Sequence, residues 1–124
     1  MTKKTIAAGI IAAALFAGAA SAQQAAYTWT GYGQNVQGSS KCPGYKMTIN
    51  VTIEGNAVRG LFQQDGREQR HFDAVLGQNG AFKTKAMLGA GASMDVTGTI
   101  KEGGESKVLL DGYCKFDAKL TKKQ

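Results

Sequence analysis

The sequence predicts an all-β protein, folded as an antiparallel up-and-down barrel of about eight strands and closed by one disulfide. Three observations predict this class. Apolar and polar residues alternate along one segment after another, which is typical of strands with one buried face. Glycine with Asn or Asp recurs between these segments, as in tight hairpin turns. The chain contains two cysteines, Cys42 and Cys114. A β-sandwich is the alternative, because alternation does not fix strand register.

The first four strands are predicted at residues 27–32, 45–54, 58–63 and 69–76. The second of these is the clearest, because five apolar residues alternate with five polar ones over its length. The third is bounded by Gly55-Asn56 and by Asp65-Gly66, and Asp-Gly favours the positive φ of hairpin turns. Consecutive strands with such short turns pair with their neighbours in an antiparallel meander.

The last four strands are predicted at residues 82–88, 94–100, 108–110 and 114–120. Asn79-Gly80 before the first of them is the strongest hairpin signal in the chain. Three glycines inside strands, Gly60, Gly98 and Gly112, suit the bends and bulges that closure of a sheet requires. Closure into a barrel is favoured over an open sheet because it removes two exposed edges.

The first 22 residues have the layout of a secretory signal peptide. Two lysines form a basic start, an apolar run follows, and Ala20-Ser21-Ala22 offers a cleavage site. A membrane-spanning helix needs about 20 apolar residues, and this run is shorter. Residues 1–22 are therefore predicted to be a cleaved signal peptide. Residues 23–124 are predicted to form a single β-barrel domain that is periplasmic or secreted.

Export takes the two cysteines to an oxidising compartment, so Cys42 and Cys114 are predicted to form a disulfide. Chain entropy gives such a long loop a stabilisation of about 4 kcal/mol. The whole chain has a net charge of +6, which becomes +4 when the two lysines of the signal segment leave. This mild balance predicts no nucleic-acid partner and at most a weak attraction to anionic surfaces.

Signals of catalysis or metal binding are sparse. The one histidine, His71, shares a strand face with Asp73, but the chain has no Gly-x-Ser-x-Gly nucleophile turn. One histidine and a cysteine pair committed to a disulfide do not make a tetrahedral zinc site. Most of the acidic residues lie in or next to predicted turns and are interpreted as solvated hairpin ends. We expect no metal, no cofactor and no enzymatic activity, with a hydrolase as the least favoured alternative.

Aromatic residues spread over the strands are the main candidates for a binding site. An eight-stranded barrel is just wide enough to be filled by side chains or to hold one small ligand. A packed core is the favoured interpretation of the aromatic set, and a ligand-lined cavity is the alternative. The candidate ligand-binding residues are Trp29, Tyr32, Tyr45, Phe62, Phe82 and Tyr113.

The longest irregular stretch, residues 33–44, is a second candidate site. It contains Ser39, Ser40 and Lys41 and would act as an interaction loop. Two functions follow from these candidates. The first is a non-catalytic exported β-barrel that binds a small apolar or aromatic ligand in its interior. The alternative is a protein- or envelope-interaction module, for example an inhibitor, that acts through residues 33–44 and the basic surface.

Four short motifs carry a resemblance to known proteins. They are Cys42-Pro43-Gly44-Tyr45, Val58-Arg59-Gly60, Asn79-Gly80-Ala81-Phe82 and Gly112-Tyr113-Cys114. Behind a signal peptide, this pattern resembles small exported proteobacterial proteins of unknown function, which implies a compartment and a fold. The meander with Trp29 in its first strand is also similar to avidin-like and lipocalin-like ligand barrels. That resemblance implies a barrel that binds a small molecule, and no binding residue of those families carries over to this chain.

Overall fold

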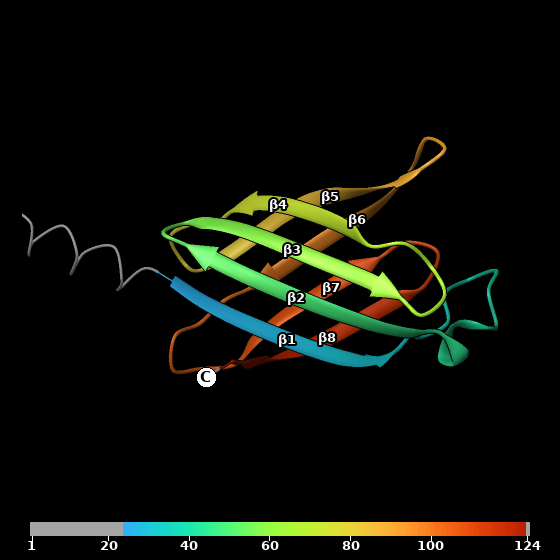
Figure 1. Ribbon diagram of the computed structural model, residues 1–124, viewed down its shortest axis with the longest axis horizontal. Coiled ribbons are helices and arrows are strands. Elements are labelled where there is room, and N and C mark those ends of the chain that lie inside the picture. The colour runs from blue at the N-terminus through green and yellow to red at the C-terminus, as the bar shows by residue number, and fades with distance from the viewer. Residues whose placement is uncertain (1–23, 124) are drawn as a thin grey trace, which may run out of the picture.

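In the computed structural model, which describes residues 24–123, eight antiparallel strands form one sheet that curls into a nearly closed barrel (Figure 1). The strands are β1 Gln24–Tyr32, β2 Lys46–Glu54, β3 Ala57–Gln64, β4 Arg70–Val75, β5 Ala81–Gly89, β6 Ala92–Thr99, β7 Ser106–Asp111 and β8 Lys115–Lys122. A short 3-10 turn, η1 Cys42–Gly44, precedes β2. The predicted all-β barrel is confirmed, and the sandwich alternative is dropped. The predicted signal peptide, residues 1–22, lies outside the described residues.

The strand order is β4-β3-β2-β1-β8-β7-β6-β5, so all strands that follow one another in sequence, except β4 and β5, pair as in a meander. The ladder between β1 and β2 is the longest and runs from Gln24↔Glu54 to Tyr32↔Lys46. The predicted hairpin turns are present. Gly80 has φ 80° and Gly66 has φ 85°, values that a residue without a Cβ adopts at little cost.

The barrel interior is filled by side chains from the inward-facing strand positions. In β2 the alternation is complete, because Met47, Ile49, Val51 and Ile53 are buried while their neighbours are more exposed. The largest fully buried side chains of the core are Phe72, Phe116, Met47, Ile49, Met94, Leu110, Val51, Val58, Val96 and Val108. A ligand therefore has no room in the middle of the barrel.

Inward-facing glycines make room for aromatic rings on the neighbouring strand. Gly60 of β3 pairs with Phe72 of β4, and the Phe72 ring lies over the glycine where a Cβ would stand. Gly98 of β6 has the same relation to Phe82 of β5. The register irregularity of the sheet lies instead between Met87 and Gly89. Gly60 and Gly98 therefore serve ring packing rather than bulges. Gly112, predicted inside a strand, lies instead in the turn between β7 and β8.

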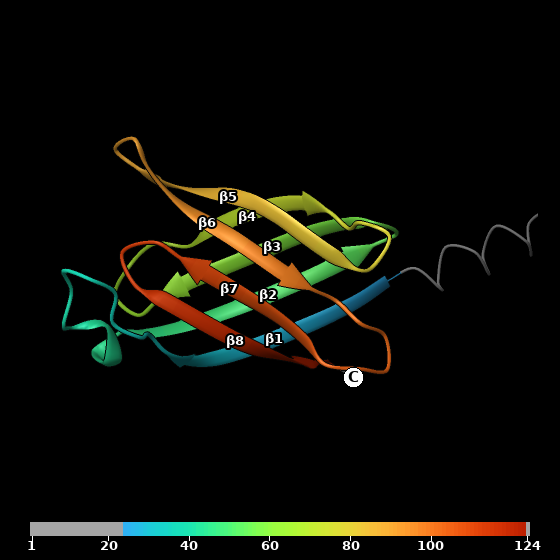
Figure 2. The same cartoon turned by 180° about the vertical axis from the view of Figure 1, so that it is seen from behind.

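Two seams complete the barrel, and neither is a full ladder. At the first, β4 and β5 run side by side (Figures 1 and 2) but are not hydrogen-bonded neighbours in the sheet. Aromatic packing bridges them, with the ring centroids of Phe72 and Phe82 6.0 Å apart. At the second, β1 and β8 pair at Tyr27↔Lys122 and Thr28↔Thr121.

The predicted disulfide is confirmed. Cys42 and Cys114 are bonded and fully buried, with their Cα atoms 5.7 Å apart. The bond ties the loop between β1 and β2 to the turn between β7 and β8. It therefore links β1 and β8, the two strands of the second seam, on the side of their pairing where β1 ends and β8 begins. A structural disulfide is consistent with an exported protein. Within residues 24–123, no helix has the length and apolar character needed to cross a membrane.

Candidate functional site

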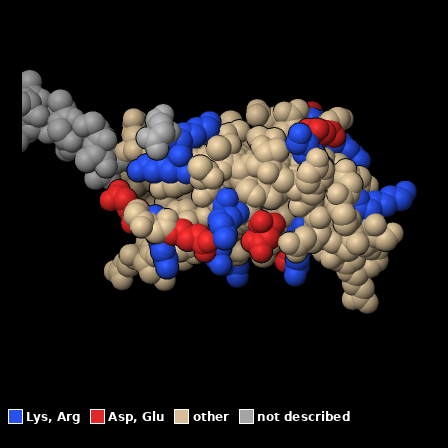
Figure 3. Space-filling model, turned by 90° about the horizontal axis from the view of Figure 1, so that it is seen from below, with Lys and Arg blue, Asp and Glu red and all other residues tan. Residues whose placement is uncertain are grey.

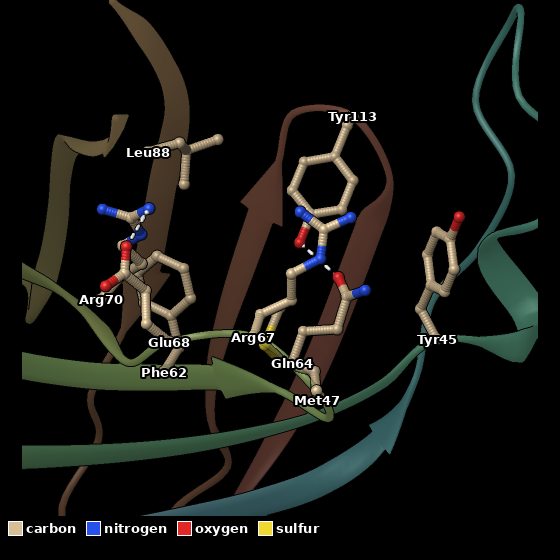
Figure 4. Close-up of a pocket in the computed structure, with 10 residues that line it drawn as sticks. Tyr45, Met47, Phe62, Gln64, Arg67, Glu68, Arg70, Leu88 and Tyr113 are labelled. Carbon is tan, nitrogen blue, oxygen red and sulfur yellow. Dashed lines mark hydrogen bonds and ion pairs between the residues drawn. The ribbon is translucent and has the colours of Figure 1, made fainter. Parts of the chain in front are cut away.

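The candidate site is an open cavity of about 640 Å³ at one end of the barrel. Four connections meet at this end, namely those that join β1 to β2, β3 to β4, β5 to β6 and β7 to β8 (Figure 1). The lining residues are Tyr45, Met47, Phe62, Gln64, Gly66, Arg67, Glu68, Arg70, Leu88 and Tyr113 (Figure 4). A volume of this size suits a small molecule. A smaller hollow of about 360 Å³ lies at the opposite end.

The floor and walls of the cavity are mainly apolar. Met47 and Phe62 are almost fully buried and form part of the barrel core, so the cavity begins where that core ends. Leu88, at the end of β5, faces inward because it follows the buried positions Phe82 and Ala86 with the period of a strand. The aromatic rings of Tyr45 and Tyr113 complete the wall. Such surfaces favour flat, apolar ligands.

A hydrogen bond crosses the mouth of the cavity. The Tyr113 hydroxyl, in the β7–β8 turn, donates to Gln64 Oε1 at the end of β3, with the two oxygens 2.6 Å apart. Gln64 is 8% exposed, so this bond satisfies a buried acceptor. Burial raises the pKa of the Tyr113 hydroxyl, while the positive charge of Arg67 opposes that rise. The bond thus holds two opposite sides of the barrel end in a fixed relation.

Three charged side chains line the rim on the β3–β4 side. The guanidinium of Arg70 pairs with Glu68, with Nη2 and Oε1 2.8 Å apart. The same guanidinium lies over Gly89 of β5, so Arg70 also spans the β4–β5 seam. Arg67 follows Gly66 in the hairpin turn and forms no ion pair with any carboxylate of residues 24–123. The rim therefore carries one uncompensated positive charge.

The structure brings together three of the six aromatic candidates. Tyr45, Phe62 and Tyr113 line the cavity. Phe82 is buried in the core against Phe72, and Trp29 is half-buried with its ring over Gly31 of its own strand. Tyr32 lies on the outer face of β1 and is 57% exposed. The cavity lies at the barrel end rather than in the middle of the interior.

The candidate interaction loop lies at the same end as the cavity. Its course is fixed by the disulfide and by a hydrogen bond from the Cys42 backbone N–H to Asn35 Oδ1. Ser39 Oγ lies 3.2 Å from the sulfur of Cys42 and is therefore part of this support. Ser40 and Lys41 are exposed. Only these two of the three candidate loop residues are free to meet a partner.

The His71–Asp73 pair lies on the outer face of β4, away from the cavity. His71 Nε2 and Asp73 Oδ2 are 3.6 Å apart, and Asp73 also accepts a hydrogen bond from Arg59 Nε at 3.2 Å. Both partners of the histidine's ion pair are more than half exposed, so the cluster resembles an ordinary solvated network. Among residues 24–123, no group of three potential metal ligands comes together.

Charges on the outside of the barrel are mixed. On the face shown in Figure 3, basic and acidic side chains lie near one another over much of the surface, and several basic ones gather at its left end. The exposed ion pairs of the barrel include Lys85 of β5 with Asp95 of β6, at 2.6 Å, and Lys119 of β8 with Glu105, which precedes β7, at 3.2 Å. The Lys85 ammonium holds the pKa of the Asp95 carboxyl below its usual value through a hydrogen bond and Coulombic attraction.

The polar part of the cavity was missed by sequence reasoning, although one signal was available. Gly60, Phe62 and Gln64 share a strand parity, so alternation places a glutamine on the inward face next to two core positions. An inward polar residue at a strand end marks the place where a core gives way to a cavity. Arg70 carries the same signal, because it shares its strand parity with Phe72 and Ala74 of β4. Arg67 carries none, because it lies in a turn and turn charges are usually solvated.

The fold and the cavity together define a class, an eight-stranded up-and-down β-barrel with a lined hollow at one end. No protein-family model matches the sequence, and a search of curated proteins finds no similar chain.

Proposed function

We propose that this protein is a non-catalytic exported binding protein whose cavity takes a small apolar or aromatic ligand. The observation that carries the proposal is the cavity of about 640 Å³ at the point where the packed core ends. Its walls combine Tyr45, Phe62, Leu88 and Tyr113 with a few polar groups. This composition is typical of small-molecule sites. The predicted signal peptide and the buried disulfide support a location in the periplasm or outside the cell.

A neutral fluorescent probe, phenylnaphthylamine, tests the proposal. Its emission rises in apolar sites, so titration into the purified disulfide-bonded protein should give saturable binding. Leu88→Trp adds a large side chain to the cavity wall, and we expect it to weaken probe binding at least about tenfold, which corresponds to about 1.4 kcal/mol. Probe emission is the suitable signal because Trp29 does not line the cavity.

The matched control is Met87→Trp. Met87 is the preceding residue of β5, but it faces outward and is 63% exposed, so the same bulk is added on the other side of the sheet. We expect this variant to bind the probe as the unmodified protein does. Equal binding by both variants, or no saturable binding by the unmodified protein, would contradict the proposal.

The interaction loop supports a second candidate function. Ser40 and Lys41 are exposed on a loop that the disulfide fixes beside the cavity, which suits contact with an envelope protein. Lys41→Glu separates the two functions. If the loop is the functional site, this variant loses a partner captured from an envelope fraction while its probe affinity stays unchanged.

A further inference from the structure

We propose that the ligand of the cavity is an anion: a flat apolar or aromatic body that carries one acidic group, with Arg67 as the residue that binds this group. The inference rests on the proposed function and narrows it to one chemical class. It follows from the distribution of charge around the rim.

The rim charges do not cancel. Arg67, Glu68 and Arg70 all line the cavity, but Glu68 pairs with Arg70 at 2.8 Å. Arg67 lies across the rim from that pair and beside the Gln64–Tyr113 bond (Figure 4). No carboxylate of residues 24–123 lies within ion-pair distance of it. The cavity mouth therefore holds a guanidinium whose charge is not neutralised by the protein.

Hydrogen-bond donors on the same wall strengthen this preference. Gln64 uses its carbonyl oxygen to accept the bond from Tyr113, and its amide nitrogen has no hydrogen-bond partner among residues 24–123. The amide N–H groups are therefore available to a ligand at the cavity mouth that Arg67 also lines. A planar guanidinium with an adjacent amide suits a carboxylate or sulfonate, because both bind through paired N–H···O bonds. A neutral ligand would leave the Arg67 charge to the solvent, since Arg67 is exposed.

The floor of the cavity holds the rest of the ligand. Met47 and Phe62 are the buried ladder partners of Gln64 and Arg70, and with Leu88 they offer carbon surface without acceptors next to the rim. A molecule that satisfies both rim and floor is amphiphilic, with its acid at the β3–β4 turn and its body over the core. Charge-assisted hydrogen bonds contribute roughly twice as much as neutral ones, so we expect the acid to raise affinity about tenfold.

Two probes that differ in one group test the inference. Anilinonaphthalene sulfonate has the same aromatic body as phenylnaphthylamine and adds one negative charge. We expect the unmodified protein to bind the sulfonate about tenfold more tightly than the neutral probe. Arg67→Gln should bring the ratio of the two affinities close to one. Glu68→Gln releases Arg70 from its ion pair, so it should increase affinity for the sulfonate.

The matched control is Arg59→Gln. It removes the same charge from the outer face of β3, where Arg59 is 69% exposed and pairs with Asp73. We expect both probe affinities to be unchanged. Equal losses in Arg59→Gln and Arg67→Gln would overturn the inference, because net charge alone would explain them.

The outcomes separate the inference from the proposed function. Equal affinity of the unmodified protein for both probes, with binding still abolished by Leu88→Trp, overturns the anionic ligand and leaves the binding cavity in place. Binding of either probe that is unaffected by Leu88→Trp places the probe elsewhere and overturns both. The same holds if neither probe binds.

Discussion

Replacement of Gly60 by alanine should destabilise the protein, although alanine suits a strand better than glycine. A Cβ at Gly60 would stand inside the space of the Phe72 ring. That ring is 1% exposed and is held between Phe62, at 6.3 Å between centroids, and Phe82, at 6.0 Å. It therefore has no free volume into which it can turn.

The magnitude follows from two opposing terms. Overpacking of a close-packed core costs about 1–3 kcal/mol, and the trapped ring places Gly60→Ala near the upper value. Alanine also lowers the conformational entropy of the unfolded chain, which stabilises the folded protein by about 0.4–1 kcal/mol. The expected net loss is about 2 kcal/mol. With an m-value of about 1 kcal/mol/M, the urea midpoint falls by about 2 M.

Urea unfolding of the disulfide-bonded protein, followed by the fluorescence of Trp29, measures this loss. Gly44→Ala is the matched control, because a Cβ at Gly44 meets nothing within 4 Å, and we expect a change of at most about 0.5 kcal/mol. A second variant, Phe72→Leu, removes the obstructing ring. In that background Gly60→Ala should cost little, which gives a coupling free energy of about 2 kcal/mol. Additive effects, or equal midpoints for the two alanine variants, would refute the reasoning.

Three further predictions concern the disulfide and two titrating groups. The Cys42–Cys114 disulfide joins residues 72 apart in sequence, so its reduction should lower the free energy of unfolding by about 4 kcal/mol. Urea unfolding with and without reductant measures this loss, and an unchanged midpoint would contradict the prediction. Burial raises the pKa of Tyr113, so its contribution to stability is complete below the unfolded value of about 10 and is lost as the pH rises through the folded value. Tyr113→Phe should therefore reduce the alkaline loss of stability in urea midpoints measured across that range, and identical pH profiles would argue against a buried hydroxyl. Lys85→Gln should return the pKa of the Asp95 carboxyl towards its usual value in an NMR titration, whereas no movement would mean that Lys85 does not act on it.

The strands could be predicted from the sequence because apolar residues dominate the inner face of each strand. The ends of the strands could be predicted less well. β1 begins at Gln24, three residues before the predicted start at Tyr27, because its partner β2 is long enough to pair with it up to Glu54. Pairing length is a property of two strands together, and the pattern within one strand does not contain it.

The site was only partly predictable, since alternation gives the face of a residue and not its height in the barrel. Phe62 and Phe82 both face inward, yet Phe62 borders the cavity and Phe82 lies in the core. Tyr32 was predicted to bind ligand but faces outward. Strand parity could have excluded it, because it is three residues from the inward-facing Trp29. Arg67 and Arg70 lie on the β3–β4 hairpin. They line a cavity only because Leu88 and Tyr113, from hairpins distant in sequence, lie at the same end of the barrel.

The incomplete seam between β4 and β5 has a consequence for chain connectivity. The two ends of the described chain meet at the other seam, where the Lys123 backbone N–H donates to the Ala26 carbonyl at 2.8 Å. A circularly permuted chain could therefore begin in the exposed turn at Asn79, run through β5 to β8, cross a short linker to β1 and end after β4. In that order every ladder joins consecutive strands, and the two edges of the sheet coincide with the two chain ends. The barrel is thus a linear meander of eight strands, and residues 24–123 enter and leave it at the middle of that meander, between β1 and β8.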